Sequence, residues 1–468
     1  MIIRTGKILL LCLGSGLLFA CFAGPNYEKP PVEMPKEFKE NKGWKSATPF
    51  DRESKGKWWE AFQDPYLSEL IAQAELSNQN LVQAEAQYLS ARALVDSARA
   101  GLFPTLTANA SSTRSKASQN TAGISTGPAN LHAVSLDASW EPDFWGRVGR
   151  AVESNAALEQ ASFGDMETLK LSVDATLAQD YFMLRILDKQ KELLDETAAG
   201  YEKSLDLTKN RYQAGVAGKV DVVQAEAQLK TTQAQAVDLA VQRSQLEHAI
   251  AVLIGRPPSL FSIPAEAFAA RIPEVPAGIP SDLLERRPDI AAAERRVAAA
   301  NAQIGVAKSA FFPALTLTAG GGYQSSALST LFTAPNTFWS LGGAIAEELF
   351  DGGVRRALVH QSEAAYEASV AAYRQTVLGA FQDVEDNLAS LRILEKEAEI
   401  QKDAVQASQM TVELYKNQYK AGTVSYLDVV TVQATELANE RTEITLLGER
   451  ITASVLLIKA IGGSWRAD

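Results

Sequence analysis

The sequence contains one helix–turn–helix pattern twice, and this internal repeat limits the folds that the chain can adopt. Residues 419–430 repeat residues 212–223 after 207 positions, with Tyr, Ala-Gly and Asp-Val-Val at the same places in both copies. The glycine of each copy, Gly215 or Gly422, favours the left-handed backbone that ends a helix. The aspartate that follows it lies in the first turn of a new helix, where a negative charge is favoured. The chain is therefore predicted to contain two helical hairpins of one design.

Two further pairs of segments have nearly the same separation, so the repeat covers most of the chain. Residues 98–107 match residues 307–316, and residues 144–151 match residues 350–357. A period of this length is too long for the unit of a solenoid. We therefore expect one internally duplicated domain, with a first repeat at 65–270, a second at 271–462 and a C-terminal tail at 463–468.

The composition argues against several classes of protein. The net charge of −11 disfavours a nucleic-acid-binding protein, which normally presents a basic face. Both cysteines, Cys12 and Cys21, lie near the N-terminus, which excludes a disulfide framework and a cysteine-ligated metal site. The three scattered histidines argue against a histidine-based metal site, and the sequence has no nucleotide-binding or hydrolase motif. We expect no enzymatic activity and no cofactor apart from a covalent lipid.

The first residues, 1–20, have the features of an export signal. A basic start precedes an apolar run, residues 8–19, that is too short to span a bilayer comfortably. The run ends at Ala20 and Cys21, a pattern that resembles a bacterial lipobox, in which the cysteine is lipidated and becomes the first mature residue. A plain signal peptide that happens to contain a cysteine is the alternative. Phe22, in place of an aspartate, implies sorting to the outer membrane.

Proline positions predict where the helices lie. Residues 21–64 are rich in Pro, Lys and Glu, so we expect a lipid-anchored, extended segment without a core of its own. Beyond it, no proline occurs in residues 66–103, 143–256, 289–312 and 336–468. Because proline breaks helix interiors, these windows are open to long helices. We expect one amphipathic helix at 66–100 and two unbroken helices at 147–212 and 353–419, each roughly 100 Å long.

The return helices, which begin near Asp221 and Asp428, carry apolar residues seven positions apart. In the second return helix these are Val430, Leu437, Ile444, Ile451 and Ile458, with Leu427, Ala434 and Val455 as a partner series that Arg441 and Gly448 interrupt. In the first they are Leu239, Leu246 and Leu253. Such a heptad predicts coiled-coil packing between antiparallel helices.

Four windows alternate between polar and apolar residues and are predicted to be strands. They are residues 103–115, 130–143, 312–325 and 336–349, so each repeat contributes one hairpin. Their length of about 10 residues fits a transmembrane β-strand. The predicted fold class is therefore mixed α+β and mostly helical. The links at 115–129 and 325–335 are expected to be exposed loops.

Four strands cannot close a membrane barrel by themselves. Unpaired strand edges are not tolerated in lipid, and the smallest closed barrels have eight strands. The chain must therefore associate if it enters a bilayer as a sheet, with two copies giving eight strands and three giving twelve. An oligomeric barrel continued by long helices would be a conduit.

Taken together, the motifs resemble the TolC-like outer membrane factors, and more narrowly the lipoprotein branch that serves RND-type drug efflux. The residues that carry the resemblance are Cys21, 24–27, Trp58-Trp59, Asp64-Pro65, Phe103-Pro104, 140–146, 285–290, 350–353 and the two Tyr-x-Ala-Gly turns. The resemblance implies a homotrimer with a twelve-stranded barrel, a periplasmic helical tunnel and a collar built from residues around 257–285 and the chain ends. Its implied partners are a periplasmic adaptor, an inner-membrane RND-type transporter and outer-membrane lipids. It implies no binding of nucleic acid.

The resemblance also implies a channel that is closed by the hairpin turn at 419–431 and opens when an adaptor docks. Tyr419, Leu427 and Asp428 match constriction positions of the family. Thr431 stands where the family often has a second acid, which predicts a less charged gate. Three copies of Asp428 would form an acidic ring, a device for cation selectivity. Asp428 is alternatively a helix-start residue stabilised by the helix dipole, and both roles can hold together.

The corresponding outer turn is marked by Tyr212, Gly215 and Asp221. Three functions remain open: an efflux channel, an exit duct for type I secretion or metal efflux, and a periplasmic coiled-coil lipoprotein scaffold without a pore. The lipobox and the Glu-Arg-Arg-Pro-Asp-Ile run at 285–290 favour efflux over protein secretion. The low Met and His counts do not support a dedicated metal exporter. A scaffold would leave the four symmetrically placed strand windows unexplained.

Overall fold

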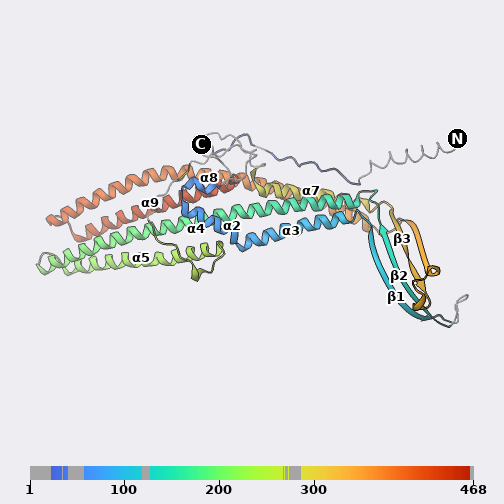
Figure 1. The fold of residues 1–468 in the computed structure, drawn as a ribbon. Helices are drawn as coiled ribbons and strands as arrows, with labels where there is room; N and C mark the ends of the chain where they lie inside the picture. The colour runs from blue at the N-terminus through green and yellow to red at the C-terminus, as the bar shows by residue number, and fades with distance from the viewer. Residues whose placement is uncertain are drawn as a thin grey trace. The chain divides into compact units, whose positions relative to one another are not determined.

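The computed structural model describes residues 23–33, 35–40, 57–118, 127–266, 268, 272–273 and 286–463. Within these residues the chain is mostly helical and contains one four-stranded antiparallel sheet (Figure 1), which confirms the predicted fold class. The predicted signal peptide and Cys21 lie outside the described residues. Among the described residues, no helix has an apolar stretch that would carry it across a membrane.

The chain forms two compact units, which we describe separately. The sheet unit comprises Met1–Pro31, Gln87–Phe163 and Ala292–Tyr373, and the hairpin unit comprises Val32–Ala86, Gly164–Ala291 and Arg374–Asp468. Both units draw on both repeats, because each repeat supplies one strand pair and one helical hairpin.

The sheet has its strands in sequence order. They are β1 (Thr105–Lys116), β2 (Pro128–Trp140), β3 (Ala314–Ser325) and β4 (Thr337–Ala346). Each repeat provides one antiparallel hairpin, and β2 pairs with β3 to join the two. The link between β3 and β4 contains two short 3-10 turns, Leu328–Thr330 and Ala334–Asn336. The outer strands β1 and β4 each have a neighbour on one side within the chain.

The helices follow the proline-free windows closely. They are α2 (Pro65–Ser77), α3 (Gln79–Ala100), α4 (Arg147–Gln213), α5 (Lys219–Leu253), α7 (Pro288–Ser309), α8 (Val354–Ala421) and α9 (Tyr426–Ala460), with 3-10 helices at Trp58–Phe62 and Pro258–Leu260. In the hairpin unit, α4 turns back into α5 and α8 turns back into α9 (Figure 1). Its fully buried residues include Leu67 and Ile71 of α2 with Leu177 and Leu184 of α4.

The single helix expected at 66–100 is wrong, because Asn78 divides it into α2 and α3. The backbone of Asn78 is extended, and its side-chain oxygen accepts hydrogen bonds from the N–H groups of Asn80 (2.9 Å) and Leu81 (3.2 Å). This makes Asn78 the N-cap of α3. Its side-chain nitrogen donates to the carbonyl of Leu253 at the end of α5 (2.8 Å). The break therefore depends on a partner 175 positions away in the sequence.

The predicted heptad of α9 needs two corrections. Leu437, Ile444, Ile451 and Ile458 are buried as expected. Leu427 is 55% exposed, and Tyr426 and Val429 are buried instead. A seven-residue series drifts by roughly 20° per heptad on a straight helix, which rotates the residues at one end away from the contact. Gly448, expected as an interruption, lies against Ile186 of α4, where a Cβ would come within 3.1 Å of the isoleucine Cγ1.

Candidate functional site

Near the helices, over residues 105–109, 135–140, 315–319 and 339–345, the two faces of the sheet differ in polarity. Farther along the strands the more apolar face also carries His132, Arg114 and Lys116. Cross-strand partners share a face, and successive residues of a strand alternate between faces. The register places these residues on the apolar face: Leu106, Ala108, Leu136, Ala138, Trp140, Leu317, Ala319, Trp339, Leu341 and Ile345. It places these on the polar face: Thr105, Thr107, Asn109, Ser135, Asp137, Ser139, Thr316, Thr318 and Ser340. This division is typical of strands that contact lipid on one face and water on the other.

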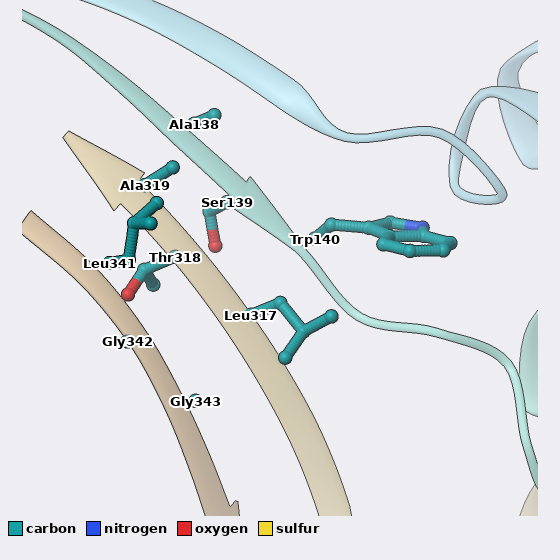
Figure 2. Close-up of a pocket in the computed structure, with 9 residues that line it drawn as sticks. All are labelled: Ala138, Ser139, Trp140, Leu317, Thr318, Ala319, Leu341, Gly342 and Gly343. Atoms are coloured by element: carbon teal, nitrogen blue, oxygen red, sulfur yellow. The ribbon is translucent and has the colours of Figure 1, made fainter. Parts of the chain in front are cut away.

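On the apolar face, the side chains of β4 are open to solvent in the part of the chain that the structure describes. Trp339, Leu341 and Ile345 of β4 are at least 75% exposed. Three consecutive residues from each of β2, β3 and β4 line a shallow hollow (Figure 2): Ala138, Ser139, Trp140, Leu317, Thr318, Ala319, Leu341, Gly342 and Gly343. None of these side chains is titratable, so the hollow offers no acid–base chemistry.

Aromatic side chains gather where the strands join the helices. They are Phe103, Trp140, Phe144, Trp145, Phe311 and Phe312. The Trp145 ring stacks on Phe312 with centroids 4.9 Å apart, and its indole N–H donates to the carbonyl of Pro313 (2.7 Å). Phe103 is 68% exposed. Aromatic girdles of this kind mark the membrane–water boundary in membrane-spanning sheets.

The two hairpin turns of the hairpin unit have the same backbone geometry. Gly215 has φ +77° and Gly422 has φ +76°, so each glycine adopts the left-handed conformation that the sequence predicts. Asp221 is half-buried, and its carboxylate accepts a hydrogen bond from the N–H of Gly218 (3.2 Å) at the start of α5. Tyr212 is 46% exposed just before the turn.

Asp428 caps the start of α9. Its Oδ2 accepts hydrogen bonds from the backbone N–H (2.9 Å) and hydroxyl (2.6 Å) of Ser425, and its own N–H donates to the Ser425 Oγ (3.3 Å). This reciprocal capping confirms the helix-start interpretation. The bonds from Ser425 hold the pKa of the Asp428 carboxyl below its usual range, which keeps it ionised near neutral pH.

The two hairpins pack against each other near their turns. One buried cluster combines Ala198, Tyr201, Leu205, Ala225 and Leu229 of α4 and α5 with Tyr419, Tyr426 and Val429 of α8 and α9. The guanidinium of Arg211 lies 4.5 Å from the centre of the Tyr419 ring and donates to the Tyr419 carbonyl (3.1 Å). Tyr426 packs on Tyr419 with ring centres 5.4 Å apart, and burial raises its pKa to about 12. Arg211 therefore joins the end of α4 to the end of α8.

The four predicted constriction residues do not share one surface. Leu427, Asp428 and Thr431 are exposed on the first turns of α9, and the Thr431 hydroxyl donates to the Leu427 carbonyl (2.9 Å). Tyr419 is 8% exposed and lies inside the cluster between the hairpins. Cys21, the predicted lipid-attachment residue, lies outside the described residues.

Sequence reasoning missed Arg211 and Ser425. Both stand where the two copies of the repeat differ: Arg211 corresponds to Gln418, and Ser425 corresponds to Gly218. A comparison of the copies for differences as well as identities would have singled out both residues. In the described part of the chain, no group of three or more His, Cys, Asp or Glu side chains is placed to hold a metal ion.

Comparisons with known proteins cover both repeats. The family model "Outer membrane efflux protein" matches residues 70–256 and 279–463. The toluene efflux pump outer membrane protein TtgC of Pseudomonas putida is 30% identical over 472 residues, which are 98% of this chain and 96% of TtgC. The pyoverdine export outer membrane protein OpmQ of Pseudomonas aeruginosa is 32% identical over 477 residues, which are 100% of this chain and 98% of OpmQ. Among solved structures, the outer-membrane channel OprN has a TM-score of 0.87 and 28% identity, and the match covers 95% of this chain and 100% of the OprN chain.

Proposed function

The chain belongs to the outer membrane efflux protein family and is an outer-membrane efflux channel, and we propose that it works as the passive, trimeric exit duct of a tripartite pump. In this proposal a periplasmic adaptor opens the duct at its tip, and an inner-membrane RND-type transporter supplies the energy. Relatives named for the export of toluene and pyoverdine support small organic molecules as the transported class.

The polarity of the sheet is the observation that carries the proposal. At the strand ends near the helices, one face is apolar and exposed and the other is polar, and β1 and β4 each have a neighbour on one side within the chain. In lipid such edges must be paired, and at least eight strands are needed to close a barrel. Three copies would pair β1 of one chain with β4 of the next and close twelve strands, with the apolar face toward lipid and the polar face toward water.

The hairpin turn at 419–431 is the proposed gate. Leu427, Asp428 and Thr431 are exposed at the start of α9, and the Ser425 cap fixes the Asp428 carboxylate in place. Three such carboxylates around one axis would attract cations and repel one another. With threonine at 431, the gate carries one acid per chain at these positions.

Replacing Asp428 with alanine is expected to increase the single-channel conductance in planar bilayers or to reduce its cation selectivity, because the acidic ring is removed. Asp221→Ala is the matched control, since Asp221 caps the equivalent helix of the other hairpin and is not a proposed gate residue. Equal effects of both substitutions would assign the change to lost capping. If D428A has the wild-type current, the proposed channel stands, but Asp428 is not part of its gate. Absence of current, together with failure to fractionate with outer membranes, would favour the scaffold.

We infer further that Cys21 carries the covalent lipid. Two residues after it, the N–H of Ala23 donates to the carbonyl of Trp145 (3.1 Å), among the aromatic residues at the end of the sheet. The guanidinium of Arg150 donates to the carbonyl of Ala23 (3.2 Å) and to the side chain of Asn26 (3.1 Å). These contacts support a lipid held at the membrane boundary.

Mass spectrometry of the N-terminal peptide tests this attachment. The mature wild-type chain should begin at residue 21 and carry acyl chains, because Cys21 is the acceptor thiol. Cys21→Ser should lack the lipid mass, because the acceptor thiol is gone, whereas the barrel should still hold the chain in the membrane. Cys12→Ser should leave the lipid unchanged. A mature wild-type N-terminus without acyl chains would favour the plain signal peptide.

A further inference from the structure

Asp137 is a charged residue on the polar face of the sheet, among uncharged neighbours. Its cross-strand partners are Thr107 on β1 and Gly320 on β3, and the same row continues to Ser340 on β4. The other ionisable side chains of the described strands are Arg114, Lys116, His132 and Tyr323, and the register places all four on the opposite face. Among the strand residues that the structure describes, Asp137 is therefore the one acidic or basic group of the polar face.

Neighbouring side chains of the same face hold the Asp137 carboxylate. The amide nitrogen of Asn109 donates to Oδ2 (2.9 Å), and so does the hydroxyl of Ser135 (2.7 Å). Hydrogen bonds to a charged oxygen are stronger than those between neutral groups, and together they restrict the rotation of the carboxylate. The carboxylate is thus oriented by two neighbours on two strands.

Gly320 makes room for this carboxylate on β3. A Cβ at Gly320 would lie 2.6 Å from Oδ1 of Asp137 and 3.2 Å from Oγ of Ser340. Any larger residue at 320 would force the carboxylate to move, because 2.6 Å is shorter than a van der Waals contact. The polar face therefore has a position that accommodates one negative charge per chain.

We propose that Asp137 is a second charge-selective position of the duct, at which three aspartates inside the barrel favour cations and positively charged organic solutes over anions. This rests on the trimeric barrel of the proposed function, in which the polar face lines the water-filled interior. Acid rings select cations in other channels, and low-dielectric walls strengthen the field of such a ring.

The described strands place Arg114 far from Asp137. Arg114 lies opposite Asn130, seven residues along β2 from Asp137, which is about 23 Å at 3.3 Å per residue. That separation is more than two Debye lengths at physiological ionic strength. At the level of Asp137, the described strands offer polar but uncharged neighbours.

The test compares reversal potentials in a KCl gradient across planar bilayers that contain the full-length trimer. The parent is Asp428→Ala, so that the ring at the gate does not contribute. Asp137→Asn keeps the size and an acceptor oxygen but removes the charge, Asp137→Glu keeps the charge, and Ser139→Asn is an uncharged control on the same face. In about 0.1 M salt, where the Debye length of about 10 Å is still well below the distance to Arg114, we expect D137N to lower the ratio of K⁺ to Cl⁻ permeability by about two- to fivefold, with D137E and S139N close to the parent.

The effect should vanish in about 1 M salt, where the Debye length falls to about 3 Å. The proposal is overturned if D137N keeps the parent ratio at low salt, or if S139N lowers the ratio as much as D137N does. A loss that persists at high salt would also contradict it, because that result indicates altered structure. A parent that forms trimers but conducts no current overturns the proposed function, and this inference with it.

Discussion

Replacing Arg211 with alanine is expected to shift the channel toward its open state. Arg211 belongs to the last turn of α4, yet it donates to the carbonyl of Tyr419 at the end of α8 (3.1 Å) and lies over the Tyr419 ring. It therefore ties the turn that carries Asp428 to the neighbouring hairpin. If the gate opens by separating these two hairpins, removal of this contact lowers the cost of opening.

The size of the effect follows from the two interactions that are lost. A hydrogen bond from a charged donor contributes about 1.5–3 kcal/mol, and a cation–π contact contributes about 0.5–2 kcal/mol. Because Arg211 is half-exposed, solvent weakens both interactions. We therefore expect their combined contribution to the closed state to be about 2 kcal/mol. That corresponds to roughly a 30-fold change in the equilibrium between closed and open states. Single-channel recording should show it as a higher open probability.

Two further variants distinguish the loss of the Arg211–Tyr419 contact from a general effect of lost positive charge. Lys209→Ala removes an exposed cation from the same turn of α4 and should leave the open probability unchanged. Arg211→Lys should be intermediate, because lysine keeps the charge but not the planar stacking group. An R211A channel with wild-type open probability, in a normally folded trimer, would show that this contact does not hold the gate.

Replacing Asp174 with asparagine is expected to stabilise the protein at pH 8. Asp174 lies on α4 and is 3% exposed, and its Oδ1 has no hydrogen-bond partner among the described residues. Burial raises its pKa to about 7, with a further contribution from the negative charge of Glu75. Lys170, which opposes this shift, is paired with Glu75 (3.0 Å).

The pH window follows from the direction of this shift. In the unfolded chain the carboxyl ionises near its ordinary pKa of about 3.9, whereas in the folded chain it stays protonated until about pH 7. Asp174 therefore lowers the free energy of unfolding progressively as the pH rises from about 4 to about 7. At about 1.36 kcal/mol per pH unit, the loss above pH 7 is at most about 4 kcal/mol. Asparagine has no charge to bury and avoids this loss.

Thermal unfolding of the detergent-solubilised trimer at two pH values checks this expectation. At pH 8, Asp174→Asn should have a higher midpoint than the wild type, and the difference should shrink toward pH 4. Asp206→Asn, which alters an exposed acid of the same helix, should show no such pH dependence. A D174N variant that is less stable than the wild type at pH 8 would indicate that the ionised carboxylate has a stabilising partner.

The sequence by itself determined the features that depend on local chemistry. Proline-free windows, together with the repeated glycine turns that divide them, placed α4 and α8 within one or two residues, because proline breaks helix interiors wherever it occurs. Gly215 and Gly422 marked the hairpin turns, because glycine adopts positive φ readily. Alternation with a period of two located the four strands and assigned each side chain to a face, because successive side chains of a strand point to opposite sides.

Tertiary structure alone decided the features that depend on distant partners. Asn78 ends α2 with the help of the Leu253 carbonyl, and Tyr419 is buried because Arg211 and the other hairpin cover it. The space for the Asp137 carboxylate depends on Gly320, which lies 183 positions later in the sequence and is placed beside Asp137 by the register of β2 and β3. Periodicity and propensity report only the neighbours of a residue along the chain, whereas hydrogen bonds and packing depend on which distant segments the fold places beside it.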